Sequence, residues 1–208
     1  MQELTRDESE NILIEGQKLN DGRWIPHSIN VAKAAERLAE NLGLDKDKAY
    51  IYGLLHDIGR RTGIMTARHT IEGYNYMKTI GHEEVGRYCL THPYFVKDID
   101  TTLGKWDMTE DETKFIVEYL DNTEYTLYDR IIQTADYMGL PSGITLIDRR
   151  IIDIHLRYGF NEKTLDNWKA IFKVQAEIEE KLGYSIYKLF PEINEGISDK
   201  LIKDVLIF

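Results

Sequence analysis

The sequence has a single cysteine, Cys89, and only four prolines in 208 residues. One cysteine excludes an intrachain disulfide framework, so we expect Cys89 to be a small buried hydrophobic residue in a reducing, cytoplasmic protein. No run of about 18 apolar residues occurs, so no membrane-spanning helix is expected. The polar N-terminal segment, MQELTRDESE, does not have the composition of a secretory signal.

Positive charge is also scarce. The 26 lysines and arginines face 36 aspartates and glutamates, and the formal net charge is −10. Because such a charge repels a phosphate backbone, we expect no nucleic-acid partner, and we expect no membrane partner either. A small anionic substrate stays compatible with this charge, since a bound cation and a few arginines can reverse the potential inside one cleft.

Several catalytic motifs are missing. The sequence has no GxxxxGK[ST] or GxGxxG phosphate loop and no GxSxG nucleophile turn. The HxxxH spacing of zinc proteases is absent as well. These absences argue against ATP-driven, nicotinamide-dependent and serine-hydrolase chemistry.

Helix-period patterns dominate what is present, and no segment alternates as a strand would. One amphipathic segment places Val31, Ala34, Ala35 and Leu38 on one face and stops at Gly43, and a second carries Ile51, Leu54 and Leu55 and ends at Gly59. Further helices are predicted at 5–19, 67–80, 83–91, 110–121, 127–139, 144–158 and 163–189. The sequence therefore predicts an all-α protein.

A histidine followed directly by an aspartate, His56-Asp57, lies in the string GLLHDIGR. The pair is embedded in an apolar stretch, where an unpaired ionised carboxylate is costly. A shared metal ion would stabilise both side chains, since imidazole and carboxylate are ligands of Mn²⁺, Fe and Zn²⁺. The alternative is a buried histidine that hydrogen-bonds its neighbour or a backbone carbonyl.

Two other polar residues interrupt apolar helix faces. His27 lies one turn before Val31 on the same stripe, and Asp136 lies in IIQTADYMGL. Either could join the same ion. The alternatives are a core histidine at position 27 and a salt bridge from Asp136 to Arg149 or Arg150.

The order His27, His56-Asp57, Asp136 resembles the HD superfamily of metal-dependent phosphohydrolases, and the strings GLLHDIG and ADYM carry the likeness. The resemblance covers about residues 25–140. It implies that these four side chains bind a divalent cation and that the fold is an HD-type helical bundle. We expect one domain over residues 1–208, with a helical C-terminal extension at 141–208.

His69 and His92 follow the order of HD subgroups that add two histidines between the His-Asp pair and the last aspartate. That likeness implies a second cation, with Asp57 as the bridge; the ions could be Fe, Mn, Mg, Zn or Ni. The alternative is that His69 only caps a helix and that His92 packs against Pro93. His82 and His155 are expected to be an exposed helix-start residue and a structural residue, respectively.

Charged residues near the motif are candidates for substrate contacts. Arg60 and Arg61 could bind phosphate oxygens, or could be surface residues favoured by the helix dipole. Glu72 lies one turn after His69 and could orient it or assist a water molecule, or could simply be solvated. Arg68 and Lys97 are weaker candidates, and the loops 60–68 and 93–109 are expected to shape the pocket.

The resemblance implies hydrolysis of a phosphomonoester, a nucleotide or a small phosphodiester by a metal-activated water, with Asp57, Arg60 and Glu72 in catalytic roles. Two alternatives stay open: an HD-fold di-iron oxygenase, and a non-catalytic module that binds a nucleotide or metal. The expected partner is a small phosphorylated molecule, and a homodimer is one alternative for the assembly.

Overall fold

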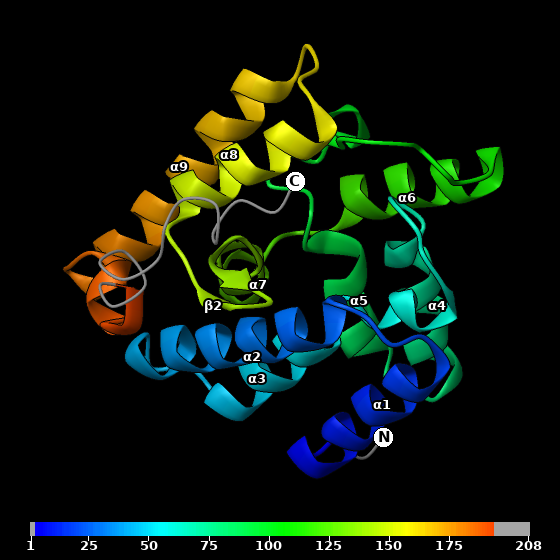
Figure 1. Ribbon diagram of the computed structural model, residues 1–208, viewed down its shortest axis with the longest axis horizontal. Coiled ribbons are helices and arrows are strands. Elements are labelled where there is room, and N and C mark those ends of the chain that lie inside the picture. Colours follow the sequence, from blue (N-terminus) through cyan, green and yellow to red (C-terminus); the bar gives the residue numbers. More distant parts are fainter. Residues whose placement is uncertain (1–2, 194–208) are drawn as a thin grey trace.

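The computed structural model describes residues 3–193, which form nine α-helices, three short 3₁₀ helices and one two-stranded hairpin (Figure 1). Helix α1 (Arg6–Leu19) begins at a capping box, in which Thr5 and Glu8 satisfy each other's backbone N–H groups. Its buried face, which includes Leu13, packs against α3 and the first 3₁₀ helix.

Helices α2 (Trp24–Asn41) and α3 (Lys46–Leu55) form the tightest helix pair. The predicted apolar stripe of α2 is fully buried, and α2 packs against α3, α7 and β1. A Cβ on Gly53 would lie 3.0 Å from the Cα of Ala32, so glycine allows the two backbones to approach closely. This approach brings His27, in the first turns of α2, beside His56 at the end of α3.

The chain turns sharply after α3 into η1 (Ile58–Thr62), α4 (His69–Thr79) and α5 (Glu83–Thr91). A Cβ on Gly59 would lie only 2.0 Å from the carbonyl oxygen of His69, so the two backbone segments are in direct contact. The carboxylate of Asp107 accepts hydrogen bonds from the backbone N–H groups of Thr66 and Arg68, at 2.8 and 2.7 Å. Both contacts fix the start of α4.

After η2 (Ile99–Thr101), helices α6 (Glu110–Asn122) and α7 (Leu127–Met138) each begin at a capping box. Helix α7 lies in the middle of the molecule and packs against α2, α3, α5, α8 and α9. Ile131, Ile132 and Ala135 on α7 are therefore fully buried. Asp136 follows them on the side of the helix that meets His27.

The C-terminal part contains the hairpin strands β1 (Gly139–Leu140) and β2 (Gly143–Ile144), then α8 (Ile147–Tyr158), α9 (Thr164–Leu182) and η3 (Ile186–Leu189). Helices α8 and α9 lie side by side against α7 (Figure 1). They cover the end of α7 from which Asp136 projects.

The all-α prediction is confirmed, with three local differences. The hairpin at 139–144 was not expected, because two-residue strands are too short to show an alternating pattern. The helix predicted at 163–189 ends at Leu182, because Gly183 adopts a left-handed conformation with φ 76°. Helix α3 ends at Leu55, so Asp57 lies in a turn and not on the helix.

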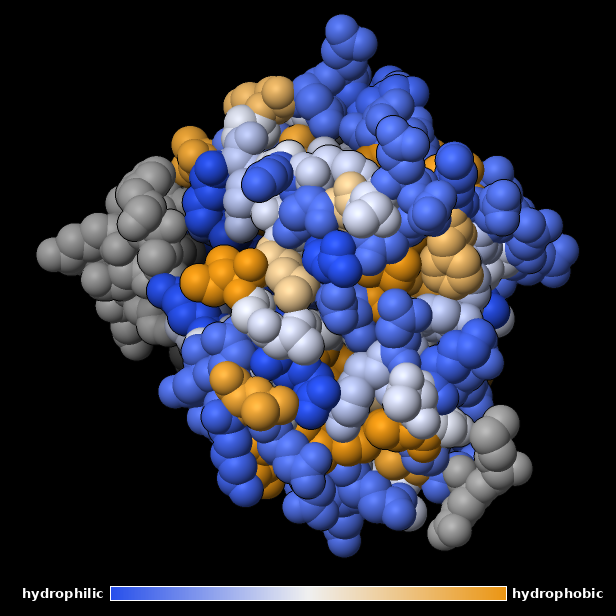
Figure 2. All heavy atoms as spheres, turned by 90° about the vertical axis from the view of Figure 1, so that its right-hand side faces the viewer, coloured by the Kyte–Doolittle hydropathy of each residue, from blue (hydrophilic) through white to orange (hydrophobic). Residues whose placement is uncertain are grey.

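One face of the molecule, over α4 and α6, is largely hydrophilic with scattered apolar side chains (Figure 2). Among residues 3–193, no helix combines the length and the apolar character needed to cross a membrane.

Candidate metal centre

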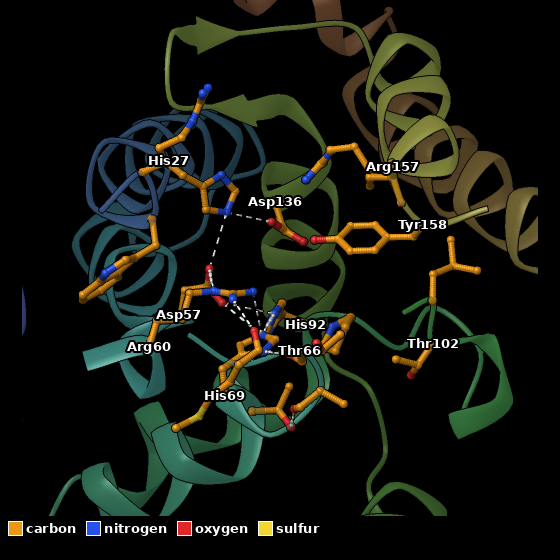
Figure 3. A pocket seen from close by; sticks show the side chains of 18 of the residues that line it. His27, Asp57, Arg60, Thr66, His69, His92, Thr102, Asp136, Arg157 and Tyr158 are labelled. Atoms are coloured by element: carbon orange, nitrogen blue, oxygen red, sulfur yellow. Dashed lines mark hydrogen bonds and ion pairs between the residues drawn. The ribbon is translucent and has the colours of Figure 1, made fainter. Parts of the chain in front are cut away.

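Six buried or half-buried polar side chains from five segments form one cluster, and Figure 3 shows all of them except His56. They are the six that the sequence predicts as metal ligands: His27 on α2, His56 and Asp57 at the end of α3, His69 at the start of α4, His92 at the end of α5 and Asp136 on α7. The structure thus brings together residues that lie far apart in the sequence; His27 and Asp136 are 109 positions apart.

One half of the cluster surrounds His27 and His56, whose Nε2 atoms lie 3.2 Å apart. The Oδ1 atom of Asp136 is 3.0 Å from Nε2 of His27 and 3.6 Å from Nε2 of His56. The Oδ2 atom of Asp57 lies 4.0 and 3.9 Å from the same two nitrogens. Four donor atoms therefore face a common centre.

The other half surrounds His69 and His92, whose Nε2 atoms lie 3.4 Å apart. Here the second oxygen of Asp57, Oδ1, is 3.0 Å from Nε2 of His69 and 3.9 Å from Nε2 of His92. This half has three donor atoms. The carboxylate of Asp57 thus points one oxygen into each half.

Backbone carbonyls fix the tautomer of all four histidines. The Nδ1 atom of His27 is 2.7 Å from the oxygen of Gly139, and that of His56 is 2.7 Å from the oxygen of Gly53. Nδ1 of His69 contacts the oxygen of Thr66, and Nδ1 of His92 lies 3.0 Å from that of Cys89. A carbonyl only accepts hydrogen bonds, so each Nδ1 carries a proton and each Nε2 faces the cluster, where it can bind a cation or a second proton.

This arrangement fits a divalent cation in each half. Paired Nε2 lone pairs at 3.2 and 3.4 Å repel each other unless a proton or a cation lies between them. Oδ1 of Asp57 is buried and has no hydrogen-bond partner within residues 3–193, although Nε2 of His69 is 3.0 Å away. A buried carboxylate oxygen beside a nitrogen lone pair is costly unless a positive charge joins them.

The electrostatics of the cluster follow from its burial. Burial opposes the charged forms, but Arg60, His69 and His56 hold the pKa of Asp57 well below its usual value. Burial likewise disfavours protonated His56, yet Asp57 and Asp136 raise its pKa. A proton on that ring can thus occupy the place that a cation would take.

Within residues 3–193 the second half has no carboxylate besides that of Asp57, and the pKa values of its histidines shift in the opposite direction. Burial and then the charge of Arg60 lower the pKa of His69. Burial and the neighbouring His56 lower the pKa of His92 to about 3. Both rings are therefore neutral at physiological pH, which is the form that binds a metal ion.

A cavity of about 620 Å³ opens onto the cluster. As predicted, parts of the loops 60–68 and 93–109 line it, including Ile64, Thr66 and Thr102. Trp24 and Arg60 also line it, and Nε of Arg60 donates to Oδ2 of Asp57 at 2.6 Å. The volume lies in the usual range for small-molecule sites.

The structure does not bring all of the charged candidates to this cavity. Glu72 accepts a hydrogen bond from Arg68 at 3.0 Å and does not orient His69, whose Nδ1 contacts the oxygen of Thr66. Arg61 stacks over the ring of Tyr76 at 3.9 Å, and Lys97 lies 5.6 Å from the ring centre of Tyr125. Neither Glu72, Arg61, Arg68 nor Lys97 is among the residues that line the cavity.

The remaining polar residues have local roles. His82 precedes α5 as its N-cap residue and is half-buried. His155 is buried and accepts a hydrogen bond from Nε1 of Trp168 at 3.2 Å, which confirms its structural role. Cys89 is fully buried, as expected.

Sequence reasoning missed the wall of the cavity that α8 provides. Arg150, Asp153, Arg157 and Tyr158 all line it. Arg150 was predicted only as an alternative salt-bridge partner of Asp136, whereas it pairs with Asp153 at 3.1 Å. The spacing i, i+3, i+7 of Arg150, Asp153 and Arg157 was the available signal, because it places three charged side chains on one helix face.

Comparison with known protein families agrees with this geometry. The family model of the HD domain matches residues 24–139, which is more than half of the chain and contains all six converging residues. The chain therefore belongs to the HD domain family. This membership implies divalent metal binding and supports a metal-dependent phosphohydrolase as the general class of the protein.

Among curated proteins, the chain is similar to several proteins named ribonuclease Y. It is 27% identical to that of Mycoplasmoides gallisepticum over 203 residues, which cover 89% of this chain and 30% of the relative. It is 44% identical to that of Pseudothermotoga lettingae over 64 residues and 40% identical to that of Mesoplasma florum over 60 residues. These two matches cover 31% and 28% of this chain, and 11% and 12% of the relatives.

The chain thus spans less than a third of the length of these relatives. No solved structure matches it.

Proposed function

We propose that this chain is a hydrolase of small phosphate esters that binds two divalent cations. His27, His56 and Asp136 would hold the first cation, and His69 and His92 would hold the second. Asp57 would bridge them through its two oxygens. The observation that carries the proposal is the convergence of four Nε2 lone pairs and two carboxylates, with every Nδ1 anchored on a backbone carbonyl.

The donor set narrows the choice of cation. Four imidazoles with two carboxylates suit Mn²⁺, Fe, Zn²⁺ or Ni²⁺ better than Mg²⁺, which prefers oxygen ligands and retains several waters. Such cations would supply a water molecule of lowered pKa and an electrophile for the phosphoryl oxygens.

The residues of the chain would provide the rest of the chemistry. Asp57 and Asp136, both of lowered pKa, stay ionised and would hold the cations and orient the attacking water. Arg60 lies 2.6 Å from Asp57, and its guanidinium would bind a phosphoryl oxygen and stabilise the charge that develops there. The cavity walls would exclude bulk water.

The substrate that fits best is a small molecule such as a nucleotide. The cavity volume of about 620 Å³ suits a small molecule. The net charge of −10 disfavours binding of a long polyanion. RNA is the second candidate, because the relatives are named ribonuclease Y. Against it, the matched parts cover only 11% to 30% of those proteins.

The test is metal analysis of protein purified without added metal, followed by a substrate panel. The panel contains nucleoside monophosphates and diphosphates, cyclic nucleotides, bis(p-nitrophenyl) phosphate and a short single-stranded RNA, each with Mn²⁺, Fe²⁺ or Zn²⁺. We expect about two equivalents of metal and the release of phosphate or of a monoester from a small substrate with or without O₂.

Three outcomes would overturn the proposal. Cleavage of the RNA alone would favour the second substrate. Turnover that requires both iron and O₂ would favour an oxygenase. Tight nucleotide binding without turnover in any metal would favour a regulatory module.

A further inference from the structure

The wall of the cavity formed by α8 carries three charged side chains on one helix face. Arg150, Asp153 and Arg157 occupy positions i, i+3 and i+7, and all three line the cavity together with the residues of the His/Asp cluster. Arg157 and its neighbour Tyr158 point from α8 into the cavity, on the side where Asp136 lies (Figure 3). The HD domain match ends at residue 139, so this wall belongs to the part of the chain outside it.

Two guanidinium groups in this wall share one carboxylate oxygen. Oδ2 of Asp153 is 3.1 Å from Nη1 of Arg150 and 2.7 Å from Nη2 of Arg157. The three side chains therefore carry one excess positive charge. Their side chains are 17%, 13% and 33% exposed, in the order Arg150, Asp153 and Arg157, so this charge is only partly solvated.

The wall also contains polar atoms without partners. Nε of Arg150 and Oδ1 of Asn167 are buried, and neither has a hydrogen-bond partner within the described part of the chain. Both residues line the cavity. Buried polar groups are normally hydrogen-bonded, so the unpaired Nε–H of Arg150 is a donor available to an anion, whereas the Asn167 oxygen would accept from a donor group of the ligand.

The charge of the cavity differs from that of the whole protein. In the part of the chain that the structure describes, its lining contains four arginines and four aspartates and no lysine or glutamate, whereas the whole chain carries −10. Asp57 and Asp136 belong to the proposed cation sites, and Arg60 pairs with Asp57. The excess positive charge at Arg150 and Arg157 is therefore available to bind an anion outside the His/Asp cluster.

We propose that Arg150 and Arg157 bind a second phosphate group of the substrate, while the first phosphate is cleaved at the His/Asp cluster. The substrate class is then a small molecule with two phosphate groups, such as a nucleoside bisphosphate or diphosphate. The role of the first phosphate rests on the proposed function, whereas anion binding by α8 does not. Arg150 and Arg157 are thus specificity-determining residues.

The test measures the binding of adenosine 3′,5′-bisphosphate and of AMP by calorimetry, with chromatography to verify that both ligands stay intact. Arg157→Gln leaves the Arg150–Asp153 pair in place, so the variant is expected to fold. It should weaken binding of the bisphosphate at least about tenfold and change that of AMP less than about twofold. Arg157→Lys, which keeps the charge but not the forked geometry, should lie between the wild type and Arg157→Gln.

The control is Arg149→Gln, a neighbouring arginine on α8 that does not line the cavity. We expect no change in binding of either ligand. Equal weakening of both ligands in Arg157→Gln, or no weakening of either, would overturn the proposal and leave these arginines a purely structural pair with Asp153. Thermal unfolding of each variant verifies that the compared proteins are folded.

The two proposals fail in different ways. If the protein binds the bisphosphate through Arg157 but hydrolyses no phosphate ester, the proposed function is refuted and anion binding by α8 stands. If monophosphates and bisphosphates are hydrolysed with equal KM, and Arg157→Gln does not change either KM, the proposed function stands and anion binding by α8 is refuted.

Discussion

The two halves of the His/Asp cluster differ in how the chain builds them. His27 and His56 come from the tightly packed pair α2–α3, and Asp136 from the central helix α7 adds a carboxylate. His69 lies at the start of α4 and His92 at the end of α5, and among residues 3–193 the carboxylate oxygen beside them is Oδ1 of Asp57.

Because of this difference, we expect the two halves to bind a cation with different affinities. Four donors with two carboxylates give a cation strong charge compensation, whereas two neutral imidazoles and one carboxylate oxygen leave more of its coordination sphere for water or substrate. We therefore expect the α2–α3–α7 half to hold its cation more tightly. The α4–α5 half would be the one that exchanges ligands during turnover.

The largest effect is expected for His56→Ala, which removes a fully buried donor atom of the proposed four-donor cation site. Activity should fall at least about 10³-fold, because one cation and the position of Asp57 are both lost. Steady-state kinetics and metal analysis measure the effect. The matched control is His82→Ala outside the cluster; a similar loss of activity in that variant would show that the effect is unspecific.

Gly59→Ala tests whether the α4–α5 half depends on backbone contact with η1. The added Cβ would lie 2.0 Å from the carbonyl oxygen of His69, so the two segments must separate. We expect the free energy of unfolding to fall by about 3 kcal/mol and the cation of the α4–α5 half to be lost first.

Gly22→Ala is the control for this variant, because its Cβ would meet only the ring of Trp24, at 3.3 Å. Urea unfolding compares the two variants. Equal stability of Gly59→Ala and the wild type would contradict the close contact.

The pH dependence of stability tests the environment of His92. Burial lowers the pKa of this ring to about 3 from an ordinary value of 6.5. Between these values the unfolded chain binds a proton at this position that the folded chain does not, so stability is lost as the pH falls. The contribution is about 1.4 kcal/mol per pH unit.

His92→Gln removes this titration. The metal-free variant should therefore lose less stability than the metal-free wild type between pH 6.5 and about 4.5 in urea unfolding. Parallel pH profiles of the two proteins would show that His92 has an ordinary pKa in the folded state.

The smallest expected effect is a difference in cation affinity between the two halves of the wild-type protein. A chelator titration should release metal in two steps, with the cation of the α4–α5 half bound at least about tenfold more weakly. His69→Ala should abolish the first step and preserve the second. A single step of release in the wild type would mean that the halves are equivalent.

The all-α class could be predicted from local patterns in the sequence, whereas the full set of six converging residues was predicted from the likeness to the HD superfamily. Ionisable residues such as Asp57 and Asp136 interrupt apolar stretches of the sequence, and burial of such a group is favourable only with a partner. Capping residues such as Thr109 and Thr126 set several helix starts within the chain itself.

What the sequence did not predict depends on packing between distant segments. Glu72 lies one turn after His69, yet tertiary structure pairs it with Arg68. The role of α8 depends on how this helix lies against α7, and no motif in 147–158 encodes that placement. The carbonyl partners of the histidines, such as Gly139 for His27, are likewise visible only in the fold.

The most direct test of the central claim is the metal content of Asp57→Ala beside that of the wild type, by mass spectrometry of protein purified without added metal. Asp111→Ala, at a fully exposed aspartate, serves as the control, and circular dichroism verifies that the helices persist. Because Asp57 directs one oxygen into each half, we predict that this variant loses both cations while the control keeps them. Undiminished metal in folded Asp57→Ala would contradict the account.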